Sequence, residues 1–477
     1  MSWTPDKGRN GKPVYKQIAA HLESLIGSGA YPPGTALPSE RELAKQLGVN
    51  RSTVVAAYDE LRSYGLVTRV RGSGTIVKHP DDDKNSPSLS WERFIRGGMI
   101  APNDRMYQKI LTEARSHPEH INFAMGELHP DLSPIELIEH LTSTLKLGRD
   151  LGYEHPLGNQ ELREALSAHL LKGRGIRSVP SSILVTSGAQ QALHLVVQCL
   201  LQPGDAVAIE DPSYAYSLPL FHSSGLRTVL LPSGPSGVKP EDIAEAYQQH
   251  RVKMVFLNPN FQNPTGSLLD TGKRREILKL AARYGIVLVE DDPYSLIRYD
   301  GEPVATLKSM DESGSVLYIS SLSKIVASGL RIGWIVGPHS VIGRLADAKQ
   351  RLDFGQSVFP QWIAARILAS GAFAEHLEQL RMALRLRRDL LAAALTKYFP
   401  NQAVFRLPEG ESICGASFRE WRAGSGCSRS PCDAGVMYTP GSLLGTSRRH
   451  IRFTFSRPDE ERIEEGIRRF REAFQAT

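Results

Sequence analysis

The apolar residues near the N-terminus recur at helical spacing and are interrupted by glycines. Residues 15–26 place their apolar side chains on one stripe of a helix, which Gly27 ends. Ser39 precedes Glu42 by three residues, a capping-box spacing that predicts the start of a second, short helix. Gly48 ends that helix. The pattern therefore predicts two helices within the first fifty residues.

A third helix and a hairpin follow at once. After the turn at residues 48–50 a helix is predicted from Arg51, with apolar residues three or four positions apart. Segments 66–71 and 75–77 flank the sequence Gly-Ser-Gly at 72–74, which predicts a hairpin. Two short helices joined by a tight glycine-containing turn are typical of a helix-turn-helix.

The exposed polar residues of this region suit a nucleic acid. The helix that begins at Arg51 carries Ser52 and Thr53 in its first turn, where a recognition helix meets base edges and phosphates. Arg69 and Arg71 flank the hairpin tip. A helical bundle with a hairpin and surface ion pairs would account for the same residues. The order of turn, cap, basic first turn and basic hairpin favours a winged helix-turn-helix that binds a double-stranded DNA operator.

From residue 119 onward, short apolar runs alternate with helical patterns. This alternation predicts the α/β class, with a mainly parallel sheet and helices on both of its faces. Ligands of such sheets bind beyond the carboxyl ends of the strands, so polar residues directly after the runs are site candidates. The runs are 183–185, 206–209, 252–257, 286–289 and 316–319.

Length and composition fit this division. A chain of 477 residues exceeds a single core, so at least two domains are expected. We expect a DNA-binding domain at 12–78, a linker at 79–118 and a body at 119–477, with a small-domain segment at 366–477. Residues 79–90 are polar, contain proline and show no periodicity, which is typical of a flexible tether.

The charge is unevenly distributed. Residues 1–80 hold eleven Lys and Arg against six Asp and Glu, whereas the rest of the chain is nearly balanced. A basic head on a neutral body indicates a polyanion partner for the head. Apolar runs long enough for a membrane span and a signal peptide are both missing, so a cytoplasmic protein without membrane contact is expected. Four cysteines without a Cys-x-x-Cys pair predict neither a disulfide framework nor a metal site.

Each polar candidate of the body also has an ordinary structural explanation, such as a surface lysine, a helix cap, a turn residue or an ion pair. Together they meet the needs of pyridoxal phosphate. This cofactor needs a lysine amine, a carboxylate for its ring nitrogen, a helix N-terminus with hydroxyls and an arginine for its phosphate, and a stacking ring. An amino compound bound there needs a further arginine for its carboxylate. The candidates are Lys324, Asp291, Asn263, Ser187, Gly188, Arg331 and Arg452.

Three strings of the head resemble the winged DNA-binding domain of the GntR regulator family. They are Leu-Pro-Ser-Glu-Arg-Glu-Leu-Ala (37–44), Gly-Val-Asn-Arg-Ser-Thr-Val (48–54) and Arg-Gly-Ser-Gly-Thr (71–75). The resemblance implies that Arg41, Arg51, Thr53 and the wing around Gly72 touch DNA. Half or more of such contacts go to phosphate and set affinity more than sequence choice.

The motifs of the body resemble fold-type I pyridoxal-phosphate enzymes, in particular the kynurenine/α-aminoadipate aminotransferase branch. Joined to a GntR head, the chain resembles the MocR subfamily of regulators over roughly residues 12–410 and 433–460. The resemblance implies that Lys324 is the Schiff-base lysine and Asp291 the partner of the pyridine nitrogen. Tyr294 and Asn263 would bind the ring's phenolic oxygen, and Tyr214 would stack on the ring.

The resemblance also assigns the phosphate and the carboxylate. The phosphate would be held by Arg331, by the start of the helix at Ser187-Gly188-Ala189-Gln190 and by the hydroxyls of Ser321 and Ser323. Tyr153 would reach the phosphate from the neighbouring subunit, and Arg452 would bind the carboxylate of the amino compound. The family's usual proline before Gly329 is Ser328 here.

We therefore expect a homodimeric transcription regulator that senses pyridoxal phosphate or an amino compound. The alternative is an active aminotransferase with an accessory DNA-binding domain. In a third interpretation pyridoxal phosphate is itself the effector.

Residues 411–432 depart from the resembling families. Their sequence shows neither strand alternation nor a helical stripe, and it holds Cys414, Cys427 and Cys432. A divergent surface loop or a cysteine metal cluster would be ordinary explanations. Our hypothesis is a pair of compensating frame shifts, one near Gly410 and one near Asp433. The small domain would then lack a strand and a helix.

Overall fold

The structure is a computed structural model of the chain. It describes residues 3–5, 13–27, 30–70, 74–78, 104–144, 152–299, 301–419, 434–445 and 450–475. The chain divides into two compact units, residues 1–98 and 99–477, and each is described by itself.

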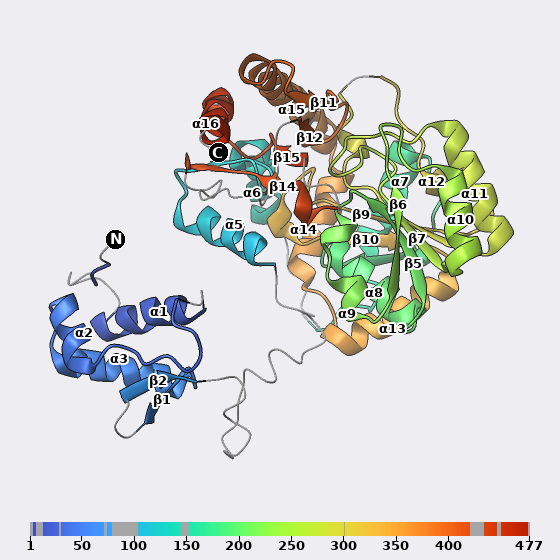
Figure 1. Ribbon diagram of the computed structural model, residues 1–477. Coiled ribbons are helices and arrows are strands. Elements are labelled where there is room, and N and C mark those ends of the chain that lie inside the picture. Colours follow the sequence, from blue (N-terminus) through green and yellow to red (C-terminus); the bar gives the residue numbers. More distant parts are fainter. Residues whose placement is uncertain are drawn as a thin grey trace. The chain divides into compact units, whose positions relative to one another are not determined.

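The first unit is a three-helix fold with a hairpin (blue in Figure 1). Its helices and strands are α1 (Val14–Gly27), α2 (Glu40–Leu47), α3 (Arg51–Ser63), β1 (Val67–Val70) and β2 (Gly74–Val77). Ser39 caps α2 by accepting a hydrogen bond from Glu42 N, and Gly48 ends α2 at a φ of 60°. Side chains from all three helices and both strands form one core, among them Ile18, Leu43, Val54, Leu61, Val67 and Val77. The predicted helix-turn-helix with a hairpin is thus confirmed.

The second unit is built on a seven-stranded sheet of order β4-β10-β9-β8-β7-β5-β6. Only β10 runs antiparallel to its neighbours. The α/β class with a mainly parallel sheet is confirmed. The strands are β4 (Ile183–Thr186), β5 (Ala206–Asp211), β6 (Arg227–Pro232), β7 (Met254–Leu257), β8 (Val287–Asp291), β9 (Val316–Ser321) and β10 (Gly333–Val336).

Helices cover both faces of this sheet, and alternate strand residues divide between them (Figure 1). One face packs against α8 (Ala189–Leu200), α9 (Leu220–Ser223) and α13 (His339–Asp353). The other packs against α7 (Gln160–Arg174), α10 (Pro240–His250), α11 (Thr271–Tyr284) and α12 (Leu307–Met310). Helix α14 (Val358–Ala369) packs on α7, and α15 (Ala372–Tyr398) packs on α14. Burial of both faces explains why the strands read as continuous apolar runs in the sequence.

A smaller antiparallel sheet of order β11-β12-β15-β14 completes the unit, beside α16 (Ile463–Gln475). Its strands are β11 (Ala403–Phe405), β12 (Ile413–Phe418), β14 (Thr439–Pro440) and β15 (His450–Thr454). A two-stranded parallel pair joins β3 (Ile121–Asn122) to β13 (Val436–Met437). Two further helices are α5 (Arg105–Ser116) and α6 (Ile135–Ser143). Helix α5 falls inside the segment expected to be linker, but Ile110 on it packs with Ala124 and Met437 of the body.

The prediction that residues 411–432 contain no strand is wrong for the first part of that segment. Residues 413–418 form β12, which pairs with both β11 and β15. The buried residues Cys414, Ala416 and Phe418 alternate with the less buried Gly415 and Ser417. A Cβ atom at Gly415 would lie 2.3 Å from Pro264 O, so close packing against another loop requires glycine there. Cys414 is buried in the core. Residues 420–433, including Cys427 and Cys432, lie outside the described residues, so the compensating pair of frame shifts itself stays a hypothesis.

Among the residues that the structure describes, every helix is too short or too polar to span a membrane.

Candidate cofactor pocket and DNA-contacting surface

A cavity of about 340 Å³ lies at the carboxyl ends of β5, β7, β8 and β9. It is the position that a mainly parallel sheet predicts for a ligand. Twelve of the candidates line it, from segments up to 264 residues apart: Gly188, Ala189, Gln190, Tyr214, Asn263, Asp291, Tyr294, Ser321, Ser323, Lys324, Arg331 and Arg452. Ser187 does not line the cavity but contacts Arg331 directly.

Asp291 ends β8 and presents a carboxylate that lacks a partner. Its Oδ1 is buried and accepts no hydrogen bond among the described residues. Burial, and then the neighbouring Asp292, raise the pKa of Asp291 to about 7, while Lys324 acts in the opposite direction. A buried carboxylate oxygen without a donor is what the protonated ring nitrogen of pyridoxal phosphate requires, so this residue fits the cofactor.

Lys324 follows β9, and its side chain extends to the segment after β3. Its Nζ donates a hydrogen bond to Gly126 O, and a Cβ atom on Gly126 would lie 3.3 Å from that nitrogen. Burial and the positive charge of Arg452 lower the pKa of Lys324 to about 8, against the opposing effects of Glu127 and Asp291. A lysine with a depressed pKa offers a neutral, nucleophilic amine closer to physiological pH.

The N-terminus of α8 and Arg331 form a cup for an anion. Gly188 is the N-cap residue at a φ of 82°, and it provides no side chain to cap the first N–H groups of the helix. Arg331 lies against it, and its Nη2 donates to Ser187 O at 2.9 Å. Free N–H groups of a helix start together with a guanidinium suit the phosphate of the cofactor.

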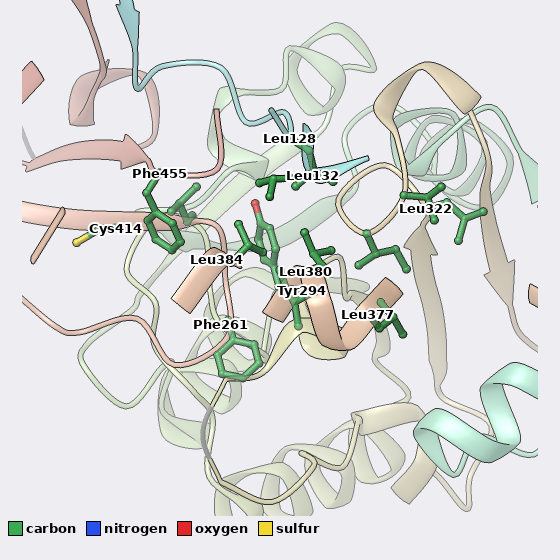
Figure 2. Packing of buried hydrophobic residues seen from close by; sticks show 14 of the residues in the cluster. Leu128, Leu132, Phe261, Tyr294, Leu322, Leu377, Leu380, Leu384, Cys414 and Phe455 are labelled. Carbon is green, nitrogen blue, oxygen red and sulfur yellow. The ribbon is translucent and has the colours of Figure 1, made fainter. Parts of the chain in front are cut away.

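Tyr214, Asn263 and Tyr294 surround the same cavity. Asn263 follows β7, and its carbonyl oxygen accepts a hydrogen bond from Tyr214 N at 3.0 Å. The hydroxyl of Tyr214 accepts a hydrogen bond from Gln190 Nε2 at 2.5 Å, which ties the aromatic ring to the start of α8. Tyr294 belongs to the main apolar cluster, together with Leu380 and Leu384 of α15 (Figure 2). Its position is therefore fixed by packing.

Arg452, on β15, brings a cation to the side of the cavity formed by the small sheet. Its Nη2 donates to Ala124 O at 2.6 Å and to Thr439 Oγ1 at 3.0 Å, and its Nε is buried without a partner among the described residues. Pairing of Arg452 with Gly415 of β12 fixes the strand register. Strand β12, which the frame-shift hypothesis expected to be missing, therefore holds Arg452 in place.

Sequence analysis missed several residues of the cavity wall. Tyr107, on α5, lines it although its segment was expected to be linker. Glu127 follows β3, which has only two residues and gives no periodic signal. Glu210, near the end of β5, lines it too, and burial raises its pKa to about 8. Glu210 directly follows the apolar run 206–209, which is the signal that identified Asp291.

Tyr153 does not line the cavity of its own chain. Its side chain is 85% exposed, and its ring lies 5.7 Å from that of Phe354. Its assignment to a neighbouring subunit's phosphate stays a prediction.

The predicted DNA-contacting residues that the structure describes lie at the surface of the first unit or close to it. Arg41, Arg51, Ser52 and Arg69 are exposed, and Thr53 is half-buried. Arg51 is the first residue of α3 and pairs with Glu40 through a 2.8 Å contact. Arg71 and Gly72, at the hairpin tip, lie outside the described residues.

Comparison with known proteins gives two family matches. Residues 14–77 match the family model "Bacterial regulatory proteins, gntR family", and residues 118–470 match "Aminotransferase class I and II". The chain is 36% identical to the uncharacterized HTH-type transcriptional regulator YisV of Bacillus subtilis, over 98% of this chain and 96% of that protein. It is 27% identical to the HTH-type transcriptional regulator NorG of Staphylococcus aureus, over 90% of this chain and 97% of that protein.

Solved structures of aminotransferases match the body. The kynurenine aminotransferase of Pyrococcus horikoshii, solved with PMP, has a TM-score of 0.75 and 31% identity, covering 81% of this chain and 98% of that one. LysN, an α-aminoadipate aminotransferase of Thermus thermophilus solved with a phosphopyridoxyl-leucine, has a TM-score of 0.73 and 26% identity, covering 81% of this chain and 99% of that one.

Proposed function

The chain belongs to the GntR regulators whose body is a class I and II aminotransferase domain, the MocR subfamily, and on this basis we propose that it regulates transcription by binding an operator through its first unit and pyridoxal phosphate with an amino compound in its second. The observation that carries this proposal is the unpartnered carboxylate of Asp291 facing the same cavity as Lys324, in a chain that also holds a helix-turn-helix.

Bound in the cavity, pyridoxal phosphate would supply an aldehyde that condenses with amines and a ring that withdraws electrons. The chain's own residues would hold and orient it. Lys324 would offer its amine, and Asp291 would keep a proton on the ring nitrogen. The N-terminus of α8 and Arg331 would bind the phosphate, and Arg452 would bind the carboxylate of an amino compound.

Regulation requires that the ligand bind more tightly to one arrangement of the protein than to another. We propose that the unit that responds is a cytoplasmic homodimer. The exposure of Tyr153, a residue whose expected target is a neighbouring subunit, supports this assembly.

The second candidate function is an active aminotransferase with an accessory DNA-binding domain. The complete set of residues around the cavity favours it, since Lys324, Asp291 and Arg452 are all present. A multiple-turnover assay with amino donors and keto acids measures this directly.

The test of the regulator is operator binding by the full-length protein. An operator fragment is selected from random DNA, and its affinity is measured with and without pyridoxal phosphate and with a panel of amino compounds. We expect at least one ligand to change the affinity or the footprint for the native protein but not for Lys324→Ala. Identical binding under every condition, together with sustained turnover, would reject the regulator in favour of the enzyme.

A further inference from the structure

Two histidines and two glutamates gather where α5 ends and β3 begins. His117 is the C-cap residue of α5, and Glu113 lies one turn earlier on that helix. Glu119 and His120 follow in the turn that leads into β3. The imidazole rings of His117 and His120 stack, with their centroids 4.7 Å apart and their planes at 11°. None of the four residues lines the cofactor cavity, so the function proposed above does not use them.

Each carboxylate faces one nitrogen of each ring. Glu119 Oε1 lies 2.9 Å from His117 Nδ1 and 3.8 Å from His120 Nε2. At the opposite edges of the rings, Glu113 Oε2 lies 3.8 Å from His117 Nε2 and 4.0 Å from His120 Nδ1. The two edges of the stacked pair are therefore not equivalent, because Glu119 approaches more closely than Glu113.

The Glu119 edge has the dimensions of a metal site. One ligand atom each from His117, Glu119 and His120 lies within 4.8 Å of the other two. Zinc with bonds of about 2.0–2.2 Å separates tetrahedral ligands by about 3.3–3.6 Å. The separations of 2.9 Å and 3.8 Å bracket this range, and the two imidazole nitrogens lie within 4.8 Å of one another. Because the stacked rings are nearly parallel, both must turn out of the stack for their in-plane lone pairs to meet at one ion.

The second nitrogen of each ring supports the same conclusion. His120 Nδ1 is buried and has no hydrogen-bond partner among the described residues. If an ion is bound at His117 Nδ1 and His120 Nε2, the remaining nitrogen of each ring carries a proton and faces Glu113. A carboxylate that accepts from the N–H of metal-bound histidines is the usual outer partner of such sites.

The neighbouring arginines form ion pairs with carboxylates other than Glu113 and Glu119. Arg462 donates to the backbone oxygen of Glu119 at 2.8 Å, but its guanidinium pairs with Asp459. Arg469 pairs with Glu465. Among the described residues, neither Glu113 nor Glu119 forms an ion pair with a lysine or an arginine.

We propose that His117, Glu119 and His120 bind one divalent transition-metal ion of the zinc type, with water as the fourth ligand and Glu113 as the outer carboxylate. Imidazole nitrogen with a carboxylate suits such ions better than calcium or magnesium. The three ligands belong to the run His-Pro-Glu-His at 117–120, which contains no cysteine.

The ion would join the end of α5 to the residues directly before β3. Helix α5 carries Tyr107 on the cavity wall. Beyond β3, Ala124 O accepts from Arg452 and Gly126 O accepts from Lys324. The metal would thus hold together two segments that meet the ligand cavity from one side.

The test uses untagged, cofactor-loaded, full-length protein. Zinc is titrated in competition with a chromophoric chelator, and bound zinc is counted by elemental analysis after dialysis. We expect one zinc per chain, and its loss in the double variant His117→Ala/His120→Ala. The matched control is His129→Ala, because His129 lies between Asp131 and Asp459 without a second imidazole and should leave zinc binding unchanged.

Two milder variants keep the test decisive if the double variant does not fold. Glu119→Gln and Glu113→Gln should each weaken zinc binding by roughly tenfold or more, as the loss of even an outer partner does. A native protein that retains no stoichiometric zinc overturns the proposal. So does unchanged affinity in the double variant or, if that variant does not fold, in both glutamine variants.

Discussion

A Cβ atom placed on Gly188 would lie 2.6 Å from Arg331 Nη2, so the guanidinium occupies the space that any side chain at this position would need. The same glycine adopts a φ of 82°, a backbone conformation that other residues rarely take. The anion cup at the start of α8 therefore depends on the absence of one side chain.

Gly188→Ala should weaken cofactor binding and destabilise the fold by about 1–3 kcal/mol, the usual cost of such backbone strain. Cofactor titration and thermal unfolding measure the two effects. Gly204→Ala is the control, because Gly204 has a φ of 90° but nothing within 4 Å of its Cβ position. It should lose stability without losing cofactor. Equal cofactor affinity in both variants would contradict the role of Gly188 in the cup.

Capture of pyridoxal phosphate by the cofactor-free protein should accelerate as the pH rises through about 8. Burial and Arg452 lower the pKa of Lys324 to that value, and only the neutral amine attacks the aldehyde. Stopped-flow absorbance gives the rate at each pH. Arg452→Gln removes a positive charge that lowers this pKa, so its midpoint should move upward. Fixation by borohydride should fail in Lys324→Ala, and the same covalent adduct in that variant would reject Lys324.

The free energy of unfolding should fall as the pH rises from roughly 4.5 to 8, in part because of Glu411. This side chain is fully buried, one of its oxygens has no partner among the described residues, and burial raises its pKa to about 8. A carboxyl group with a raised pKa stabilises the fold when protonated, below its unfolded value, and that contribution is lost as the pH rises toward the folded value.

Glu411→Gln should remove this pH dependence, with a gain in unfolding free energy at pH 8 of at most about 5 kcal/mol, since one pKa unit is about 1.4 kcal/mol. Denaturant unfolding across the pH range measures it. Glu461→Gln, at an exposed site, is the control. Parallel pH profiles for Glu411→Gln and the native protein would show that Glu411 is not buried as an acid. Glu210 and Glu290, whose pKa values burial also raises, retain their share of the slope in both proteins.

Arg51→Ala should weaken specific operator binding by roughly 1–3 kcal/mol if its guanidinium contacts a base. Its ion pair joins a guanidinium that is 52% exposed to a Glu40 carboxylate that is 14% exposed, so loss of the pair should lower the melting temperature only modestly. Binding isotherms at several salt concentrations separate this effect from phosphate contacts, which steepen the salt dependence. Arg62→Ala, at the other end of α3, is the matched control. An equal loss of operator affinity in both variants would contradict a base contact by Arg51.

Resequencing the coding DNA tests the frame-shift hypothesis for the part beyond β12. Because β12 is formed, only a helix should be recovered when residues 420–433 are translated in the other two frames. An amphipathic stretch in either frame supports the hypothesis. If neither frame gives one, the segment is a true loop of this protein.

The sequence by itself determined the fold class and the helix-turn-helix, and it named twelve of the residues that line the cavity. These features rest on local signals. Ser39 and Gly48 bound α2 through their own backbone preferences, and fully buried strands such as β4 and β9 require continuous apolar runs. Asp291 lies two residues after the apolar run 286–289 and Lys324 five residues after the run 316–319, so these candidates could be placed near strand ends.

Only the tertiary structure decided the features that depend on distant parts of the chain. Strand β12 is short, and its buried residues Cys414, Ala416 and Phe418 alternate only over the second half of the strand, so its pairing with β11 and β15 is what identifies it. Tyr107 enters the cavity wall only because α5 packs on the body. The lowered pKa of Lys324 likewise arises from burial and from Arg452, which is 128 positions further along the chain. Local periodicity cannot reveal such contacts, because their energy depends on which segments the folded chain brings together.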